Sequence, residues 1–130
     1  METTHKSFRI IRKTLILNNS VNLTEFRIQT CTFSNSPTGN AGVSIETSGT
    51  TNATLIVEMN SLFTGLFGDG FQAITTTGSS GTINVTVKNS TFNNGALLGN
   101  GGIFMAPFGG PVNFTFDIDG NTLENIMLPI

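Results

Sequence analysis

The segment Val85-Thr86-Val87-Lys88-Asn89-Ser90-Thr91-Phe92 is one of four copies of a motif in this chain. Each copy has a triplet with apolar ends, a polar turn and then a large apolar residue. The copies are Phe26-Arg27-Ile28 with Phe33, Leu55-Ile56-Val57 with Phe63, Val85-Thr86-Val87 with Phe92, and Phe116-Asp117-Ile118 with Leu123. Their last triplet residues follow one another at intervals of 29, 30 and 31 positions, so the period is about 30 residues.

A second apolar segment lies out of phase with the first and opens each time with glycine, at residues 39–45, 68–74 and 99–105. Further turn-forming clusters follow at Gly49, at 78–81 and at 109–111. Apolar residues at alternate positions predict strands with one buried face. Hairpins with two-residue turns do not explain why equivalent strands return every 30 residues with the same inward phase. The repeat therefore predicts an all-β fold, a right-handed parallel β-helix of about four coils, with coils over residues 13–125.

Composition narrows the class of protein further. A chain of 130 residues is long enough for one domain. Charged residues make up 11% of it, against roughly 25% in ordinary soluble domains, and the formal net charge is −2. No broad positive field is available for nucleic acid, so we expect no nucleic-acid partner. Cys31 is the only cysteine, which excludes an internal disulfide and a multi-cysteine metal site. No apolar run approaches the roughly 20 residues of a membrane span, so we expect no transmembrane segment.

The turns of the repeat carry a resemblance to a known family. The strings are Asn89-Ser90-Thr91-Phe92-Asn93-Asn94, Cys31-Thr32-Phe33-Ser34-Asn35 and Asn121-Thr122-Leu123-Glu124-Asn125. They resemble the coils of pectin-lyase-like right-handed β-helices, and more narrowly the repeats of large secreted or surface-attached bacterial proteins and autotransporter passengers. The resemblance covers about residues 14 to 125 and implies an extracellular or cell-surface location. It implies no single function, because this fold carries lyases, hydrolases, adhesins and fibres alike.

The ends of the chain depart from the repeat. Residues 1–12 are expected to form an N-terminal cap or arm, with Phe8, Ile11 and Leu15 at helical spacing, and residues 126–130 form an apolar C-terminal tail. Lys13 to Leu17 is in phase to be a strand of an incomplete opening coil. One extra residue within 58–62 predicts a β-bulge in the second coil.

Candidate chemistry is sparse. In the predicted register Gln29, Glu58, Lys88 and Asp119 form one outward column, which is interpreted as a surface charge ladder rather than a catalytic cluster. Asp117 and Asp119 form a weak candidate site for calcium, because hard oxygen ligands at alternate positions suit that ion. The only histidine, His5, lies outside the repeat, so we expect no histidine-based catalytic site and no cofactor.

Asparagine and threonine on outward strand positions also create acceptor sequences for N-glycosylation. They begin at Asn18, Asn22, Asn52, Asn84, Asn89 and Asn113. In an Asn- and Thr-rich chain such triplets arise readily by chance.

Candidate interface residues lie at the two ends and on one apolar patch. They are Phe104, Phe108, Ile126, Met127, Leu128, Ile130, Arg9, Arg12 and Lys13. The predicted function is a non-catalytic structural or adhesive β-solenoid that forms homo-oligomers by end-to-end stacking, with a polysaccharide or a cell-surface molecule as candidate ligand. Two alternatives stay open. One is a carbohydrate-binding or carbohydrate-active fragment, similar to a lyase or hydrolase. The other is a monomer or face-to-face dimer in which residues 1–12 fold over one end.

Overall fold

A computed structural model describes residues 9–10, 13–17, 22–36, 41–93 and 102–126, which contain strands and turns but no helix. The strands are β1 (Arg9–Ile10), β2 (Lys13–Leu17), β3 (Asn22–Gln29), β4 (Thr32–Ser36), β5 (Ala41–Thr47), β6 (Thr50–Glu58), β7 (Leu62–Leu66), β8 (Asp69–Thr75), β9 (Ser80–Lys88), β10 (Thr91–Asn93), β11 (Ile103–Pro107), β12 (Val112–Asp119) and β13 (Thr122–Glu124).

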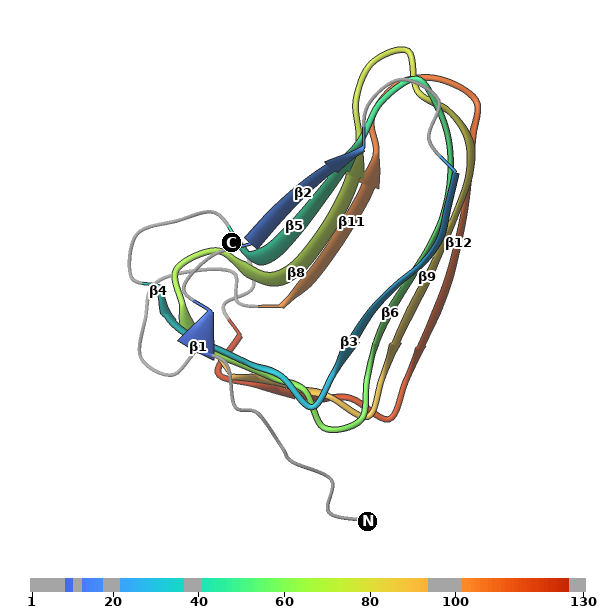
Figure 1. Cartoon of the computed structure of the whole chain (residues 1–130). Coiled ribbons are helices and arrows are strands. Elements are labelled where there is room, and N and C mark those ends of the chain that lie inside the picture. The colour runs from blue at the N-terminus through green and yellow to red at the C-terminus, as the bar shows by residue number, and fades with distance from the viewer. Residues whose placement is uncertain (1–8, 11–12, 18–21, 37–40, 94–101, 127–130) are drawn as a thin grey trace.

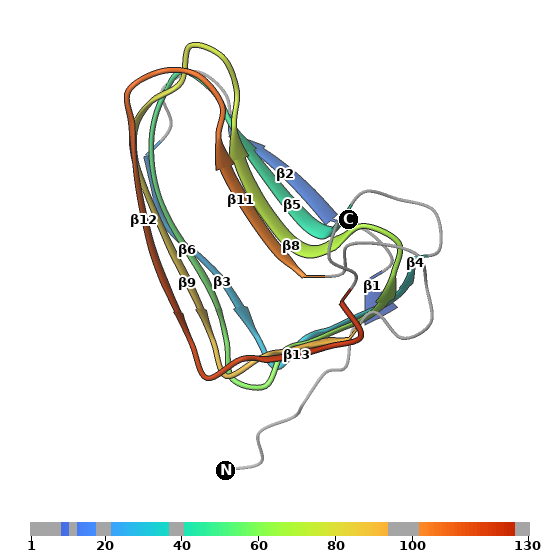
Figure 2. The same cartoon turned by 180° about the vertical axis from the view of Figure 1, so that it is seen from behind.

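These strands form three parallel sheets that run along the solenoid. The sheets have the orders β1-β4-β7-β10-β13, β2-β5-β8-β11 and β3-β6-β9-β12. The two four-stranded sheets face each other across the interior, and the short five-stranded sheet closes one side (Figure 1; Figure 2 shows the opposite view). Each strand therefore pairs with the strands one period before and after it.

The register is the one that the repeat predicts. Ile28 pairs with Val57, Val57 with Val87, and Val87 with Ile118. In the five-stranded sheet the corresponding column is Phe33, Phe63, Phe92 and Leu123. The predicted parallel β-helix of about four coils is therefore confirmed.

The core contains the buried members of these two columns together with inward residues of β5 and β8, such as Val43 and Phe71. The rings of Phe33, Phe63 and Phe92 stack with centroid separations of 4.8 and 4.6 Å and are almost parallel. The packing explains one glycine at the start of a strand. A Cβ placed on Gly70 would lie 2.5 Å from Cδ1 of Phe92, so a larger residue does not fit there.

The corner between the triplet and the large apolar residue was only partly predicted. The residue after the turn begins a separate short strand, which makes a third sheet. The chain turns through one non-glycine residue with positive φ at Thr30 (52°) and again at Asn89 (47°). In the second coil two consecutive residues, Met59 and Asn60, have φ of 57° and 60°. The extra residue is thus taken up in the turn, and the bulge expected within 58–62 was wrong.

A bulge does occur in β3. Leu23 pairs with Ala53 and Phe26 pairs with Leu55, so two residues of β3 lie opposite one residue of β6.

The opening coil begins earlier than residue 13. Arg9 and Ile10 already pair with Thr32 and Phe33 as β1. Leu15 lies in strand β2 and not in a helix, whereas Phe8 and Ile11 lie outside the described residues. At the other end Ile126 is partly buried against the core.

Candidate functional site

The predicted charge ladder has the expected backbone register but different side-chain partners. Gln29 pairs with Glu58 in the ladder of β3 and β6, and Lys88 pairs with Asp119 in that of β9 and β12. The ion pair of Lys88, however, is made with Asp117, whose Oδ2 lies 2.5 Å from the Lys88 Nζ. Asp117 is a diagonal neighbour, two residues before the directly paired Asp119, and long side chains reach such neighbours.

A second ion-pair group lies on the same outer surface, at the N-terminal edge. Arg27 Nε lies 2.7 Å from Glu25 Oε1, and its Nη1 contacts Glu58, again a diagonal neighbour. The hydrogen bond from Arg27 lowers the pKa of Glu25. Similarly, the hydrogen bond with Asp117 raises the pKa of Lys88. The pairs of Lys88 with Asp117 and of Arg27 with Glu58 join adjacent coils, whereas the pair of Arg27 with Glu25 lies within one strand. These groups are solvent-exposed, so each pair contributes little to stability.

Calcium finds little support at the predicted position. Asp117 and Asp119 are both exposed on β12, but Asp117 is already paired with Lys88. Within the described ranges no group of three or more His, Cys, Asp or Glu side chains is placed to hold a metal ion.

The C-terminal end of the solenoid exposes its interior. Phe116, Ile118 and Leu123 occupy inward columns, but they are 62%, 44% and 52% exposed. Val87 and Phe92, one coil earlier in the same columns, are fully buried at 0%. The last coil thus presents apolar side chains and the edges of three strands, β11, β12 and β13.

The N-terminal edge carries residues that match this end. It consists of strands β1, β2 and β3. The pairing of the four strands of one sheet places Ile28 in the same column as Ile118. In the same way Arg27 shares a column with Asp117. The two ends therefore carry apolar residues at equivalent positions and opposite charges at another.

The remaining predicted interface residues are placed unevenly. Phe104 and Phe108 are 38% and 56% exposed, and Phe104 pairs with Gln72 on the outward side of the sheet. Phe67, which the sequence did not single out, is 49% exposed. The backbones of Arg9 and Lys13 lie in β1 and β2 at the N-terminal edge. Arg12, Met127, Leu128 and Ile130 lie outside the described residues.

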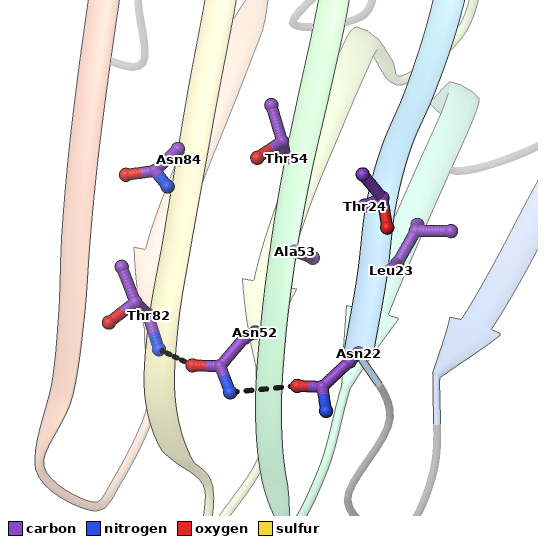
Figure 3. Close-up of a pocket in the computed structure, with 8 residues that line it drawn as sticks. All are labelled: Asn22, Leu23, Thr24, Asn52, Ala53, Thr54, Thr82 and Asn84. Carbon is purple, nitrogen blue, oxygen red and sulfur yellow. Dashed lines mark hydrogen bonds between the residues drawn. The ribbon is translucent and has the colours of Figure 1, made fainter.

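A shallow hollow on the outer face of the β3-β6-β9-β12 sheet was not predicted. It has a volume of about 210 Å³. Figure 3 shows two rows of polar side chains, with Asn22, Asn52 and Thr82 in one row and Thr24, Thr54 and Asn84 in the other. The signal available in the sequence was the Asn-x-Thr triplet, which was interpreted only as a glycosylation acceptor.

Comparison of the chain with protein-family models, curated proteins and solved structures finds no match. Among the residues that the structure describes, no helix has the length and apolar character needed to cross a membrane. The fold assignment therefore rests on the register of this chain, and any function has to be argued from its own surfaces.

Proposed function

We propose that this chain is a non-catalytic structural or adhesive module whose copies stack end to end. The observation that carries the proposal is the open C-terminal coil, where Ile118 is 44% exposed although Val87 in the preceding coil is 0% exposed. A terminal coil with no further coil stacked on it has both unpaired strand edges and exposed apolar side chains. A further coil stacked on this end would pair with the strand edges and cover the apolar side chains.

A second copy supplies such a coil if it continues the register. Its β3 would then follow β12, so that its Ile28 lies next to Ile118 and its Phe26 next to Phe116. Its β1 and β2 would follow β13 and β11, in the same sheet orders. A head-to-tail contact of this kind repeats without closing, and the product is a fibre.

Charge supports the same polarity. In the continued register Arg27 of the second copy lies beside Asp117 of the first. Asp117 is already bound to Lys88, and Arg27 is already bound to Glu58. The contact would join these two pairs into one row of alternating charges across the junction. Stacking with one copy reversed would not form this row, so the charges favour the head-to-tail orientation.

The main alternative is a carbohydrate-active fragment. A lyase or hydrolase needs an acid and a base that are free to exchange protons with a substrate. The carboxylates of Glu25, Glu58 and Asp117 are instead paired with basic side chains. This pairing favours the structural proposal, and the family resemblance supports placing the module outside the cell or on its surface.

The test is a single charge placed in the open interior column. We expect the unmodified chain to form elongated species whose mass rises with concentration in the micromolar range, measured by analytical ultracentrifugation and electron microscopy. Ile118→Lys should abolish them, because a charge buried at the junction is strongly unfavourable. Thr115→Lys is the matched control, since it adds the same charge to the same strand at an exposed position between the inward columns.

The same variant also tests the direction of assembly. Ile118→Lys retains an intact N-terminal edge, so it can add to the C-terminal end of a wild-type fibre and stop its growth there. Substoichiometric amounts should shorten the fibres, whereas Thr115→Lys should be incorporated without shortening them. A wild-type chain that stays monomeric at several hundred micromolar would overturn the proposal, as would equal behaviour of the two variants.

A further inference from the structure

The outer face of the β3-β6-β9-β12 sheet carries two adjacent positions that are occupied only by asparagine or threonine. The first position holds Asn22, Asn52, Thr82 and Asn113 in register across all four coils. The second, two residues further along each strand, holds Thr24, Thr54, Asn84 and Thr115. The charged Arg27 and Asp117 belong to a different column of the same sheet. Eight uncharged hydrogen-bonding side chains therefore form a strip along the solenoid.

The hollow of about 210 Å³ lies within this strip, next to the β3 bulge. At the bulge two residues of β3, Thr24 and Glu25, lie opposite Thr54, and Figure 3 draws no hydrogen bond between the side chains of Thr24 and Thr54. The hollow is lined by six of the eight strip residues together with Leu23 and Ala53. None of the described residues that line it is charged or aromatic.

Two hydrogen bonds fix one side of the hollow. Asn52 Nδ2 donates to Asn22 Oδ1 at 2.9 Å, and Asn52 Oδ1 accepts from the Thr82 backbone N–H at 3.1 Å (Figure 3). Asn52 is thereby held in one orientation. On the other side, no hydrogen bond within the described part of the chain occupies the side chains of Thr24, Thr54 or Asn84. They remain available as donors and acceptors.

The chemistry of these groups selects the ligand. A site with hydroxyl and amide groups but no charge favours a neutral ligand that carries many hydroxyls, because each ligand hydroxyl both donates and accepts. The hollow is smaller than the roughly 300–1,000 Å³ of ordinary small-molecule pockets, so it accommodates one unit of a longer chain. Equivalent groups recur every coil, at about 4.8 Å. A linked sugar ring has a length similar to this spacing.

We infer that the strip is a binding site for a neutral polysaccharide that runs along the solenoid axis, with one sugar seated in the hollow. Without an aromatic ring to stack on, each sugar is held by hydrogen bonds alone, and affinity comes from several weak contacts along the chain. An acidic polysaccharide fits poorly, since no cation lines the hollow. The inference goes beyond the proposed assembly and does not depend on it.

The experiment uses the full chain carrying Ile118→Lys, so that assembly and binding are separated. Hexasaccharides of cellulose, β-1,3-glucan, xylan and mannan are titrated into ¹⁵N-labelled protein, with hexagalacturonate as the acidic comparison. We expect at least one neutral hexasaccharide to shift the amide signals of β3, β6 and β9 with a dissociation constant below about 10 mM. Hexagalacturonate should bind more weakly.

Variants locate the site. Thr54→Val removes one free hydroxyl at nearly constant shape, and Asn84→Ala removes one free amide. Each should weaken binding about three- to tenfold, as expected for one lost hydrogen bond. Thr86→Val is the control, because Thr86 is also outward on β9 but does not line the hollow. The inference is overturned if none of the neutral hexasaccharides binds, if hexagalacturonate binds best, or if Thr54→Val and Thr86→Val behave alike. If wild-type fibres form while binding fails, this inference alone falls.

Discussion

In the stack of three phenylalanine rings, the central ring has a ring on each side, whereas an outer ring has one on one side. The effect of this difference on the free energy of unfolding can be measured. Phe63 lies between Phe33 at 4.8 Å and Phe92 at 4.6 Å, with interplanar angles of 5°. Among the described residues Phe92 stacks on one ring, that of Phe63, and the next residue in its column is Leu123. We expect Phe63→Leu to lower the free energy of unfolding more than Phe92→Leu does.

The magnitude follows from how many stacked ring pairs each substitution removes. An aromatic pair contributes about 0.5–1.5 kcal/mol beyond the burial of its surface. Phe63→Leu removes two such pairs, or about 1–3 kcal/mol, whereas Phe92→Leu removes one, or about 0.5–1.5 kcal/mol. Burial does not explain a difference, since the two side chains are 1% and 0% exposed. A difference of this size is measurable against a total stability of about 5–15 kcal/mol.

The assay is equilibrium unfolding in urea followed by far-ultraviolet circular dichroism, because the chain has no tryptophan or tyrosine to report by fluorescence. All variants are made together with Ile118→Lys, so that association does not add to stability. Phe33→Leu is the internal control and should resemble Phe92→Leu, since Phe33 also has one aromatic neighbour. Equal losses of stability at positions 63 and 92, or a larger loss at 92, would refute the reasoning.

Three further predictions concern a close contact, a turn and a surface ion pair. Gly70→Ala should destabilise the fold by about 1–3 kcal/mol, measured by urea unfolding, because the new Cβ would lie 2.5 Å from a Phe92 ring carbon. Met59→Gly should raise the free energy of unfolding by about 0.5–1 kcal/mol, since Met59 has φ of 57° and is 55% exposed. The pKa of Glu25 is lowered from its ordinary 4.5 by Arg27, so this pair stabilises the fold above pH 4.5 and ceases to do so as the pH falls through the folded-state pKa. The melting temperatures of wild type and Glu25→Gln should therefore converge on acidification.

Each of these predictions has a control. Ser44→Ala places the same side chain at an outward position of β5 and should cost less than Gly70→Ala. Met59→Ala places another non-glycine residue at a position with positive φ, so it should not raise the free energy of unfolding as glycine is expected to do. Thr86→Val, which changes no titratable group, should keep a difference in melting temperature from wild type that does not close on acidification. The argument for the close contact is contradicted if Gly70→Ala is as stable as wild type, and that for the turn if Met59→Gly is destabilised. The argument for the ion pair is contradicted if the difference in melting temperature between wild type and Glu25→Gln does not change with pH.

Much of the fold could be predicted because the period and the inward phase determine one register. Ile28, Val57, Val87 and Ile118 were assigned to one column from their spacing alone, and the strands pair in that way. The third sheet was not predicted. Its strand β10 has three residues, Thr91–Asn93, which is too short to show alternation. In the second coil a bulge was expected where the turn is in fact one residue longer. The spacing of the repeat shows that there is an extra residue but not whether it lies in the strand or in the turn.

The surface was harder to predict than the core. Side chains such as Lys88 reach either a direct or a diagonal neighbour, and the choice of Asp117 over Asp119 depends on rotamers, which the repeat pattern does not reveal. The hollow lies next to a bulge between Leu23 and Phe26, which is visible in the sequence only as one additional residue relative to the next coil.

The pairing of every strand with its counterparts in the adjacent coils has a consequence for how such a chain can change in length. Residues 64–92 comprise one complete period, from the position after one stacked phenylalanine to the next, Phe92. An unequal recombination event that copied this segment in frame would insert one coil with the same inward columns and lengthen the molecule by about 4.8 Å. The flanking coils would keep equivalent neighbours, because stability in such arrays is close to a sum over adjacent units. Length is thus a trait that can vary in whole-coil steps without a new core having to evolve.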